Sequence, residues 1–336
     1  MPRLIASVLT VVLAWSAVAS AGAVSAEPAA PSDSCVVVDT DFDIDDMMTI
    51  PTVIGARHVA AIVATEGYTL APIGASAISR LVAEPDQRHI PVIVGAGNNR
   101  PEASIGDSLG SWVLTYRGVM NRLNNFLPTD LPPAPGPDDY VQQVIDSVAD
   151  CGQVDVLVIG TFTSFVNYVP AIRDKIGRVV MTGRPLQGDP EVEPGESFNC
   201  GYDLPSCEEA FHEQLPGLDQ TYVDVQRGDC DKTPNKSECE GTVYGPTLAM
   251  ARALGPVGLP NTLAQMLLND SNTWALDTWE QSGYGGRSLF WDQSTALALI
   301  DPGLFRPVGV HVETVLNPEE FQHKWAEITN LSTSYA

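Results

Sequence analysis

Five carboxylates fall within eight residues near the start of the chain, in segment 39–46: Asp39, Asp41, Asp43, Asp45 and Asp46. The three valines just before them, at 36–38, favour a strand that is buried on both faces. Carboxylates at the end of such a strand repel one another and cannot all reach solvent. A hard divalent cation such as Ca²⁺, which prefers oxygen ligands, would offset that repulsion. The segment therefore predicts a site for a divalent metal ion.

Two other interpretations of the acidic segment were weighed. A run of charges is often only a solvated turn. An EF-hand loop also begins with alternating acidic residues, but its glycine and terminal glutamate are missing here, and the preceding segment is predicted as a strand rather than a helix. The solvated turn stays open as the alternative to a metal site.

Apolar runs of strand length alternate with helical patterns along the chain. The predicted strands are 36–38, 58–65, 90–94, 154–159 and 178–181, and the predicted helices are 47–54, 74–82, 140–149 and 164–172. This alternation predicts an α/β fold with a mainly parallel central sheet, helices on both faces and a Rossmann-like core. Ligands of such sheets bind at the carboxyl ends of the strands, where the acidic segment lies.

Two long stretches are predicted to be surface loop insertions. Residues 184–201 are rich in Gly, Pro and acidic residues, and 215–245 hold two cysteines and a glycosylation sequon. No internal repeat divides the chain, so we expect a single domain over residues 27–336.

The first 26 residues have the pattern of an export signal. Arg3 is followed by an apolar run at 4–15 and by small residues up to Ala26, where cleavage is expected. That run is shorter than the roughly 20 apolar residues of a membrane-spanning helix. We expect a secreted protein with no membrane anchor after signal cleavage.

The cysteines favour disulfides, because their number is even and the chain is predicted to enter an oxidising compartment. They are Cys35, Cys151, Cys200, Cys207, Cys230 and Cys239. Short spacings suggest the pairs Cys200–Cys207 and Cys230–Cys239, which leaves Cys35 to meet Cys151. Six cysteines allow many other pairings, so the sequence alone leaves the connectivity open.

The overall charge argues against one class of partner. The chain has 42 acidic and 18 basic residues, a formal net charge of −24, and no cluster of Lys or Arg. Such a surface repels polyanions, so nucleic acid is not an expected partner. A small-molecule substrate is expected, and a homo-oligomer remains open.

The acidic segment also resembles a family signature. Asp39, Asp41, Asp45 and Asp46 meet the Asp-x-Asp-x-x-x-Asp-Asp pattern of the inosine–uridine nucleoside hydrolases. Three later blocks are similar to this family and follow in the same order. Residues 156–164 resemble its strand and Gly-x-x-Thr-Asn turn, with Ser164 in place of Asn, and residues 179–183 with 197–203 resemble its Met-Gly-Gly and Glu-x-Asn segments. Residues 290–302 resemble its His-Asp or Trp-Asp helix start.

The resemblance implies a nucleoside hydrolase-like fold and Ca²⁺-dependent hydrolysis of the N-glycosidic bond of ribonucleosides to free base and ribose. It assigns Ca²⁺ to the carboxylates of Asp41, Asp46 and Asp292 and to the backbone carbonyl of Ile159. Asp41 is also the expected general base, because glycosidic cleavage needs a carboxylate that accepts a proton from the attacking water.

The resemblance implies two contacts with the ribose. Asp45 is expected to bind a ribose hydroxyl, and Asn199 to contact the sugar near its 5′ end, although Asn199 also suits a loop cap. After the second predicted strand the alignment allows Glu66 or Tyr68, and Glu66 could bind another ribose hydroxyl.

Tryptophans suggest how the base is bound. Trp291 stands where many family members have a His that protonates the departing base, which is similar to the purine-preferring branch, where stacking on indole replaces that acid. Trp112 is a candidate for the opposite wall, with a buried core position as the alternative.

Two departures from the family pattern concern the 5′ side of the ribose. Ser197 replaces a usual Glu, and Arg184 replaces a common Asn. Arg184 could favour a 5′-anionic substrate such as a nucleotide, or it is a surface arginine. Two other functions therefore stay open: a secreted nucleoside-binding protein with lost catalysis, and a hydrolase of a different ribosyl compound.

Overall fold

A computed structural model gives the fold. It describes residues 34–83, 90–97, 111–124, 139–182, 198–223, 244–245, 247–269, 288–289, 291–309 and 311–333. These residues belong to one unit, Pro31–Ala336. The predicted signal sequence at 1–26 lies outside the described residues, as do Arg184, Ser197, Cys230 and Cys239.

Eight strands form the central sheet in the order β3-β2-β1-β4-β5-β6-β10-β9. They are β1 (Ser34–Thr40), β2 (His58–Ala64), β3 (Val92–Val94), β4 (Gln153–Val158), β5 (Ile176–Thr182), β6 (Asp219–Val223), β9 (Phe305–Val308) and β10 (His311–Thr314). All neighbouring strands run parallel except β10 and β9. The predicted mainly parallel sheet is confirmed.

The strand order contains a switch point between β1 and β4. From β1 the chain builds outward to β2 and β3, then returns to the other side of β1 and builds outward again through β4, β5 and β6. Connections on the two sides of a switch point diverge, which leaves a crevice at the carboxyl ends of its two strands. In this chain the strands concerned are β1, which leads into the acidic segment, and β4.

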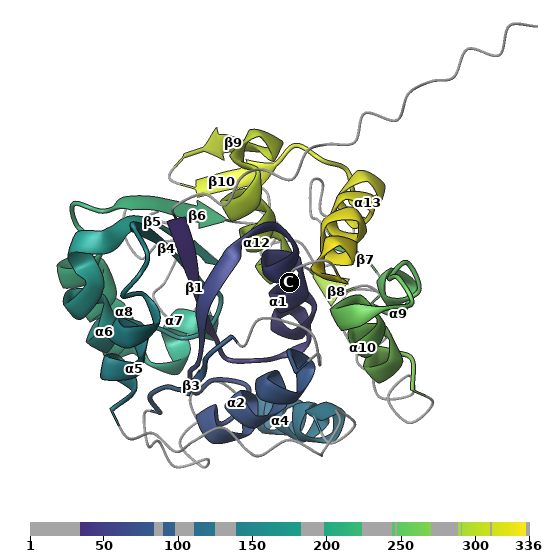
Figure 1. Ribbon diagram of the computed structural model, residues 1–336, viewed down its shortest axis with the longest axis horizontal. Helices are drawn as coiled ribbons and strands as arrows, with labels where there is room; N and C mark the ends of the chain where they lie inside the picture. Colours follow the sequence, from purple (N-terminus) through teal and green to yellow (C-terminus); the bar gives the residue numbers. More distant parts are fainter. Residues whose placement is uncertain are drawn as a thin grey trace, which may run out of the picture. The chain divides into compact units, whose positions relative to one another are not determined.

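Helices cover both faces of the sheet (Figure 1). Val36 and Val38 of β1 face one apolar core, whereas Cys35 and Val37 face the other. The first core is covered by α1 (Ile44–Ala56), α2 (Ala71–Leu81), α4 (Ser111–Asn124), α9 (Thr247–Ala251), α10 (Gly258–Leu267), α12 (Trp291–Ile300) and α13 (Pro318–Thr329). The second is covered by α5 (Tyr140–Ser147), α6 (Phe165–Ile172), α7 (Phe198–Tyr202) and α8 (Leu204–Glu209).

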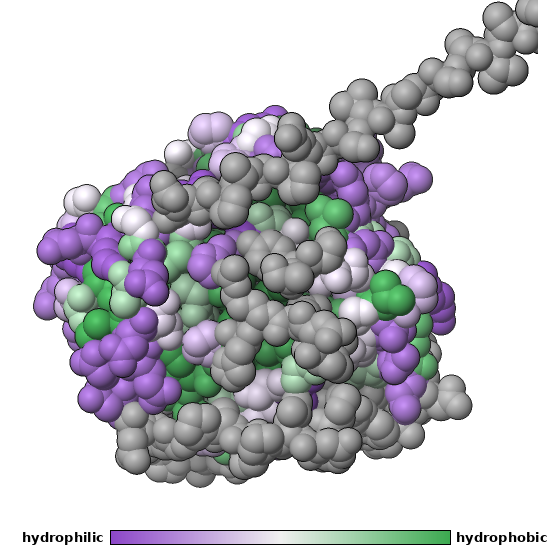
Figure 2. Space-filling model, in the orientation of Figure 1, coloured by the Kyte–Doolittle hydropathy of each residue, from purple (hydrophilic) through white to green (hydrophobic). Residues whose placement is uncertain are grey.

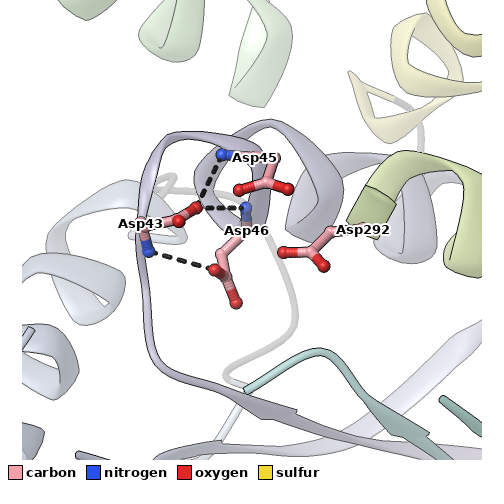
Figure 3. A group of neighbouring side chains, drawn as sticks. All are labelled: Asp43, Asp45, Asp46 and Asp292. Atoms are coloured by element: carbon pink, nitrogen blue, oxygen red, sulfur yellow. Dashed lines mark hydrogen bonds between the residues drawn. The ribbon is translucent and has the colours of Figure 1, made fainter. Parts of the chain in front are cut away.

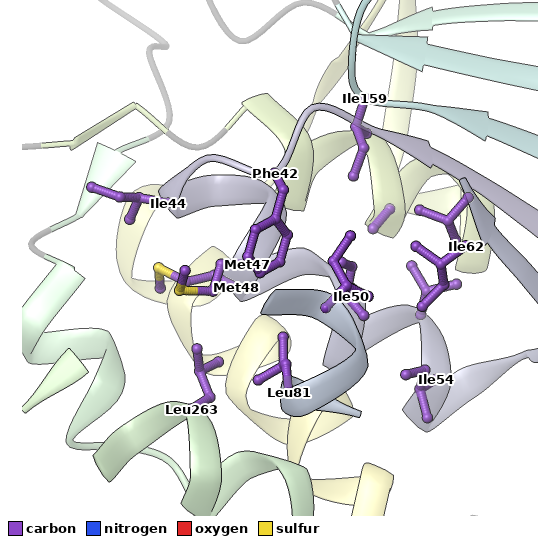
Figure 4. Packing of buried hydrophobic residues seen from close by; sticks show 14 of the residues in the cluster. Phe42, Ile44, Met47, Met48, Ile50, Ile54, Ile62, Leu81, Ile159 and Leu263 are labelled. Atoms are coloured by element: carbon purple, nitrogen blue, oxygen red, sulfur yellow. The ribbon is translucent and has the colours of Figure 1, made fainter. Parts of the chain in front are cut away.

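Helix α1 is buried along nearly its whole length. Ile44, Met47, Met48 and Ile50 pack into the first core together with side chains from α2 and α10 (Figure 4). Burying each such side chain contributes roughly 1.5–3 kcal/mol. Helix α13 fixes α1 from outside, where Trp325 Nε1 donates to the carbonyl of Met48 at 3.2 Å. This packing holds the first turn of α1, which carries part of the acidic segment.

The loop predictions are partly wrong. Within the predicted insertion 215–245, Asp219–Val223 forms β6 between β5 and β10. Within 184–201, residues 198–201 belong to α7. Strand β6 was not predicted because it has no apolar run: Val223 is its single fully buried residue, and the other four are polar or partly exposed. A small second sheet pairs β7 (Tyr244–Gly245) with β8 (Ser288–Leu289).

The described residues place hydrophilic side chains on the surface, and their helices are of limited length. On the face shown in Figure 2, hydrophilic residues gather over the outer sides of the helices that flank the sheet. Within the described part of the chain, every helix is too short or too polar to cross a lipid bilayer.

Two of the three predicted disulfides are confirmed. Cys35 bonds to Cys151, with Cα atoms 5.8 Å apart, and Cys200 bonds to Cys207, with Cα atoms 5.2 Å apart. The first bond ties the amino end of β1 to the residue that precedes β4 by two positions. The expected pair Cys230–Cys239 lies outside the described residues.

Removal of the two disulfides should destabilise the protein unequally. The pairs are 116 and 7 residues apart, and a longer closed loop restricts the unfolded chain more. We expect a loss of about 5 kcal/mol in free energy of unfolding for Cys35→Ser with Cys151→Ser, and about 2 kcal/mol for Cys200→Ser with Cys207→Ser. Urea denaturation of both double variants checks this, and equal losses would contradict it.

Candidate metal centre and active site

The turn from β1 into α1 is built by the acidic residues themselves. Asp43 caps α1: its Oδ1 accepts hydrogen bonds from the backbone N–H of Asp45 at 2.9 Å and of Asp46 at 3.5 Å. In return the backbone N–H of Asp43 donates to Asp46 Oδ2 at 3.0 Å. This capping box satisfies exposed donors at the helix start and places Asp45 and Asp46 in the first turn, where the helix dipole favours carboxylates.

The same turn contains an unusual backbone conformation. Phe42 has a φ of 51°, in the left-handed region that side chains other than glycine rarely adopt. Its ring is fully buried, and its carbonyl accepts a hydrogen bond from Thr69 Oγ1 at 2.9 Å. Packing and hydrogen bonding thus hold a strained residue between Asp41 and Asp43, as is common where a site fixes its geometry.

Four carboxylates converge although one of them is far away in the sequence. Asp43, Asp45, Asp46 and Asp292 each offer an oxygen, and these oxygens lie within 4.8 Å of one another. Figure 3 shows Asp292, from the first turn of α12, pointing toward Asp45 and Asp46 of α1. Asp45 is half-buried and the other three are buried.

Hydroxyl groups orient two of these carboxylates. Thr182, the last residue of β5, donates from Oγ1 to Asp292 Oδ1 at 3.0 Å. Thr40, the last residue of β1, donates from Oγ1 to Asp46 Oδ1. Each carboxylate oxygen has two lone pairs, so these bonds leave acceptor capacity for a cation.

Asp41 lies beside this group and is 2% exposed. Its Oδ2 accepts a hydrogen bond from the backbone N–H of Tyr68 at 2.9 Å. A Cβ atom at Gly67 would lie 2.1 Å from Asp41 Oδ2, and one at Gly160 would lie 2.5 Å from the backbone nitrogen of Asp41. Glycine at both positions is therefore required for the ends of β2 and β4 to approach Asp41.

Asp39, the first Asp of the signature, does not join the group. Its carboxylate faces the second core and accepts a hydrogen bond from Thr65 Oγ1. Burial raises its pKa to about 7. Its backbone carbonyl accepts from the N–H of Ile159 at 2.8 Å, which holds the end of β4 against β1.

The electrostatics of the group are dominated by burial and mutual repulsion. Burial, with repulsion by neighbouring aspartates, raises the pKa of Asp46 to about 8 and the pKa of Asp45 to about 6. The same causes raise the pKa values of Asp41, Asp43 and Asp292 well above the usual range. Within the described residues no ion pair includes any of the five. An all-oxygen donor set with uncompensated negative charge fits a hard divalent cation.

Ile159 and Asn199, both predicted from the sequence, are brought together. Ile159 follows β4, so its carbonyl lies at the same sheet edge as the end of β1. That carbonyl accepts a hydrogen bond from Asn199 Nδ2 at 3.1 Å. The amide of Asn199 therefore orients the predicted carbonyl ligand, and its role toward the sugar stays a prediction.

Glu66 belongs to a separate polar network. Its Oε1 accepts from the hydroxyl of Tyr202 at 2.6 Å, and that hydroxyl accepts from Arg117 Nη2 at 2.9 Å. Arg117 also donates to the carbonyl of Gly67 at 2.6 Å. The network fixes the loop after β2 to α4 and α7, and binding of a ribose hydroxyl by Glu66 stays a prediction.

Three rings, which we call the aromatic group, lie next to the aspartates: Tyr68, Tyr116 and Phe198. The rings of Tyr68 and Phe198 are stacked with their centroids 3.8 Å apart, and the rings of Tyr68 and Tyr116 pack nearly at right angles with their centroids 4.7 Å apart. Burial and repulsion from Asp43 and Asp45 raise the pKa of Tyr116. Sequence reasoning missed the group as a unit, because its members come from three separate segments; the nearest signals were Tyr68 as an alternative to Glu66 and Phe198 beside Asn199.

The structure describes only some of the remaining predicted site residues. Trp291 is half-buried and is the first residue of α12, next to Asp292. Trp112 lies in α4, but its side chain is outside what the structure describes, as is the whole of Arg184. Asp43 was counted in the acidic segment but received no role, although its place three residues before Asp46 is the spacing of a capping box.

Several solved structures of similar fold are nucleoside hydrolases. A purine-preferring ribonucleoside hydrolase from Gardnerella vaginalis is 19% identical, with a TM-score of 0.57 over 88% of this chain and 99% of that one. A plant nucleoside hydrolase is 17% identical, with a TM-score of 0.58 over 88% and 98%. An inosine-uridine preferring nucleoside hydrolase from Bacillus anthracis is 12% identical, with a TM-score of 0.52 over 88% and 99%. These likenesses show a shared fold.

Family-level comparison extends this result to the sequence. A search of curated proteins found no significant match to the chain. The family model described as inosine-uridine preferring nucleoside hydrolase matches residues 36–328, which include all five aspartates of the site and Ile159. This chain belongs to the inosine-uridine preferring nucleoside hydrolase family.

Proposed function

We propose that this nucleoside hydrolase is a secreted, Ca²⁺-dependent enzyme that cleaves the N-glycosidic bond of ribonucleosides and prefers purines. The observation that carries the proposal is the meeting of Asp46 with Asp292. Their carboxylate oxygens come from two helices far apart in the sequence, yet they belong to one group with oxygens within 4.8 Å of one another. The family is metal-dependent, and this group offers oxygen donors that could hold such an ion.

The proposed Ca²⁺ ligands are the carboxylates of Asp41, Asp46 and Asp292 and the carbonyl of Ile159. All are hard oxygen donors, and at least one oxygen of each carboxylate is held by a hydrogen bond, which lowers the ordering cost of binding. When bound, the cation supplies positive charge that offsets the repulsion and makes a neighbouring water more acidic.

Asp41 is the proposed general base. Its Oδ2 is fixed by the N–H of Tyr68, and a cation beside it favours the ionised form that accepts a proton from water. Cleavage passes through an oxocarbenium-like state, whose positive charge on the ribose is stabilised by the surrounding carboxylates. Asp45, the half-buried member, is assigned to a ribose hydroxyl and Asn199 to the 5′ side.

The purine preference rests on Trp291. Its position next to Asp292 suits a ring that stacks on the base, and Trp112 is the proposed opposite wall. The Gardnerella vaginalis hydrolase of similar fold is named as purine-preferring, which supports this assignment.

Secretion rests on the amino-terminal export pattern and on the cysteines. The bonds Cys35–Cys151 and Cys200–Cys207 fit a protein that matures in an oxidising compartment.

Loss of the proposed base should abolish turnover. We expect Asp41→Asn to lower kcat/KM for inosine by about 10²- to 10⁴-fold, because the attacking water loses its proton acceptor. Release of free base from inosine, adenosine, guanosine, uridine and cytidine measures this, with purines expected to lead. Asp219→Asn, at an exposed position of β6, is the control and should keep full activity. Nucleoside binding without base release by the wild type would instead favour the binding-protein hypothesis.

Ca²⁺ should stabilise the protein through Asp292. In chelator we expect Asp292→Asn to melt at or above the wild-type temperature, because one repelling carboxylate is removed. Calcium at 100 times its Kd should stabilise the wild type by about 3 kcal/mol and leave the variant nearly unchanged. Thermal unfolding with and without calcium tests both the melting temperature in chelator and the stabilisation by calcium. An equal calcium effect on the two proteins would refute the ligand assignment.

The metal-free protein should lose stability as the pH rises. Asp46 has an unfolded pKa near 3.8 and a folded pKa of about 8, so the folded state holds the extra proton between these values. The stability from this group is complete below the unfolded pKa and is lost as the pH rises through the folded pKa. Urea unfolding in chelator from about pH 5 to about pH 8 should show the decline, and Asp46→Asn should show a smaller one. A flat wild-type profile would argue against raised pKa values.

A further inference from the structure

A buried arginine reaches the loop that holds Asp41. Arg117, on α4, is 4% exposed. Its Nη2 donates to the carbonyl of Gly67 at 2.6 Å, and its Nε donates to the carbonyl of Tyr68 at 3.2 Å. A third bond, from Nη2 to the hydroxyl of Tyr202 at 2.9 Å, fixes the guanidinium in turn. Two consecutive carbonyls thus match the rigid fork of donors that distinguishes arginine from lysine.

One peptide group joins this arginine to the aspartate. The carbonyl of Gly67 and the N–H of Tyr68 belong to the same planar unit, which is trans and directs the two groups to opposite sides. Arg117 donates to the carbonyl, and the N–H donates to Asp41 Oδ2 at 2.9 Å. A charged donor on the carbonyl polarises the peptide group and strengthens the bond made by its N–H, by roughly 10–30%.

This peptide group lies directly against the carboxylate. A Cβ atom at Gly67 would lie 2.1 Å from Asp41 Oδ2 and 2.7 Å from its Cγ. The backbone therefore contacts the carboxylate without an intervening side chain at this position. A rotation of the peptide plane changes the contact with Asp41 directly.

The rest of the loop has supports that do not involve Arg117. The N–H of Thr69 donates to the carbonyl of Asp41 at 3.2 Å, and Thr69 Oγ1 donates to the carbonyl of Phe42 at 2.9 Å. The ring of Tyr68 packs within the aromatic group. Loss of the guanidinium should therefore weaken one peptide contact while the loop keeps its fold.

We propose that Arg117 is a positioning residue, which acts on Asp41 through the peptide group between Gly67 and Tyr68. It fixes the carboxylate that accepts a proton from the attacking water, so the inference rests on the role of Asp41 in the proposed function. The guanidinium acts through one peptide group and takes no part in the proton transfer itself.

The bond to Asp41 can be observed by NMR in chelator. Selective ¹⁵N labelling of tyrosine gives nine amide signals, and Tyr68→Phe removes one of them, which assigns the Tyr68 amide. Arg117→Met removes the charge and keeps the apolar stem. We expect it to shift the Tyr68 amide proton upfield, because a weaker bond to the carboxylate deshields that proton less. Arg117→Lys keeps the charge but only part of the fork, and should give a smaller shift.

Kinetics at saturating calcium show whether the contact matters for turnover. We expect Arg117→Met to lower kcat for inosine about tenfold and to change KM by about threefold at most, because a displaced base affects the transition state more than substrate binding. Arg117→Lys should recover part of the loss. The matched control is Arg173→Met, since Arg173 also binds two backbone carbonyls, those of Gln214 and Pro216, but lies before β5 at the amino edge of the sheet. It should keep the wild-type kcat.

The outcomes separate this inference from the proposed function. An unmoved Tyr68 signal or an unchanged kcat in Arg117→Met overturns the inference, and so does an equal loss of kcat in Arg173→Met. If Arg117→Met does not fold, Arg117→Lys decides, and wild-type values of both the signal and kcat overturn the inference. If the wild type cleaves no nucleoside, the proposed function fails, while the Tyr68 signal still tests whether Arg117 controls the bond to Asp41.

Discussion

Repulsion between buried carboxylates is the constraint around which the carboxyl edge of this sheet is organised. The three aspartates proposed as metal ligands are each held by a donor that does not neutralise them: a backbone N–H for Asp41, a threonine hydroxyl for Asp46 and another for Asp292. These bonds fix position and leave the charge for a ligand to balance. The local structure therefore makes sense as the negative half of a charge pair whose other half is a cation.

The fold supplies the rigidity that such an arrangement needs. Asp45 and Asp46 are carried by α1, a helix buried between the sheet and α13, so their separation from Asp292 is set by core packing rather than by a surface loop. Asp41 and Ile159 extend from β1 and β4, the neighbouring strands at the switch point. A site built on such elements resists the movement by which repelling groups would otherwise separate.

Features that arise from a continuous stretch of sequence were mostly predicted, whereas contacts between distant segments were mostly missed. Apolar strands such as β1 and β4 and the acidic turn after β1 are continuous patterns, and both were predicted. Strand β6 was not, because a strand with one fully buried residue has no apolar run. The stack of Tyr68 on Phe198 arises from a contact between segments, whereas the capping role of Asp43 has a local signal that went unused. Asp292 was found because the family resemblance, rather than its surroundings in the sequence, pointed to it.

The Cys35–Cys151 bond has a consequence for motion. It joins β1 and β4 at the end opposite the site, so these two strands are linked covalently at one edge and by the Asp39–Ile159 hydrogen bond at the other. Neither strand can separate from the other without unfolding of the sheet centre. Amide protons of β1 and β4 should then exchange with solvent only through global opening, whereas partial openings are left to the outer strands. The two ends that carry Asp41 and Ile159 thus keep a fixed separation throughout local fluctuations of the molecule.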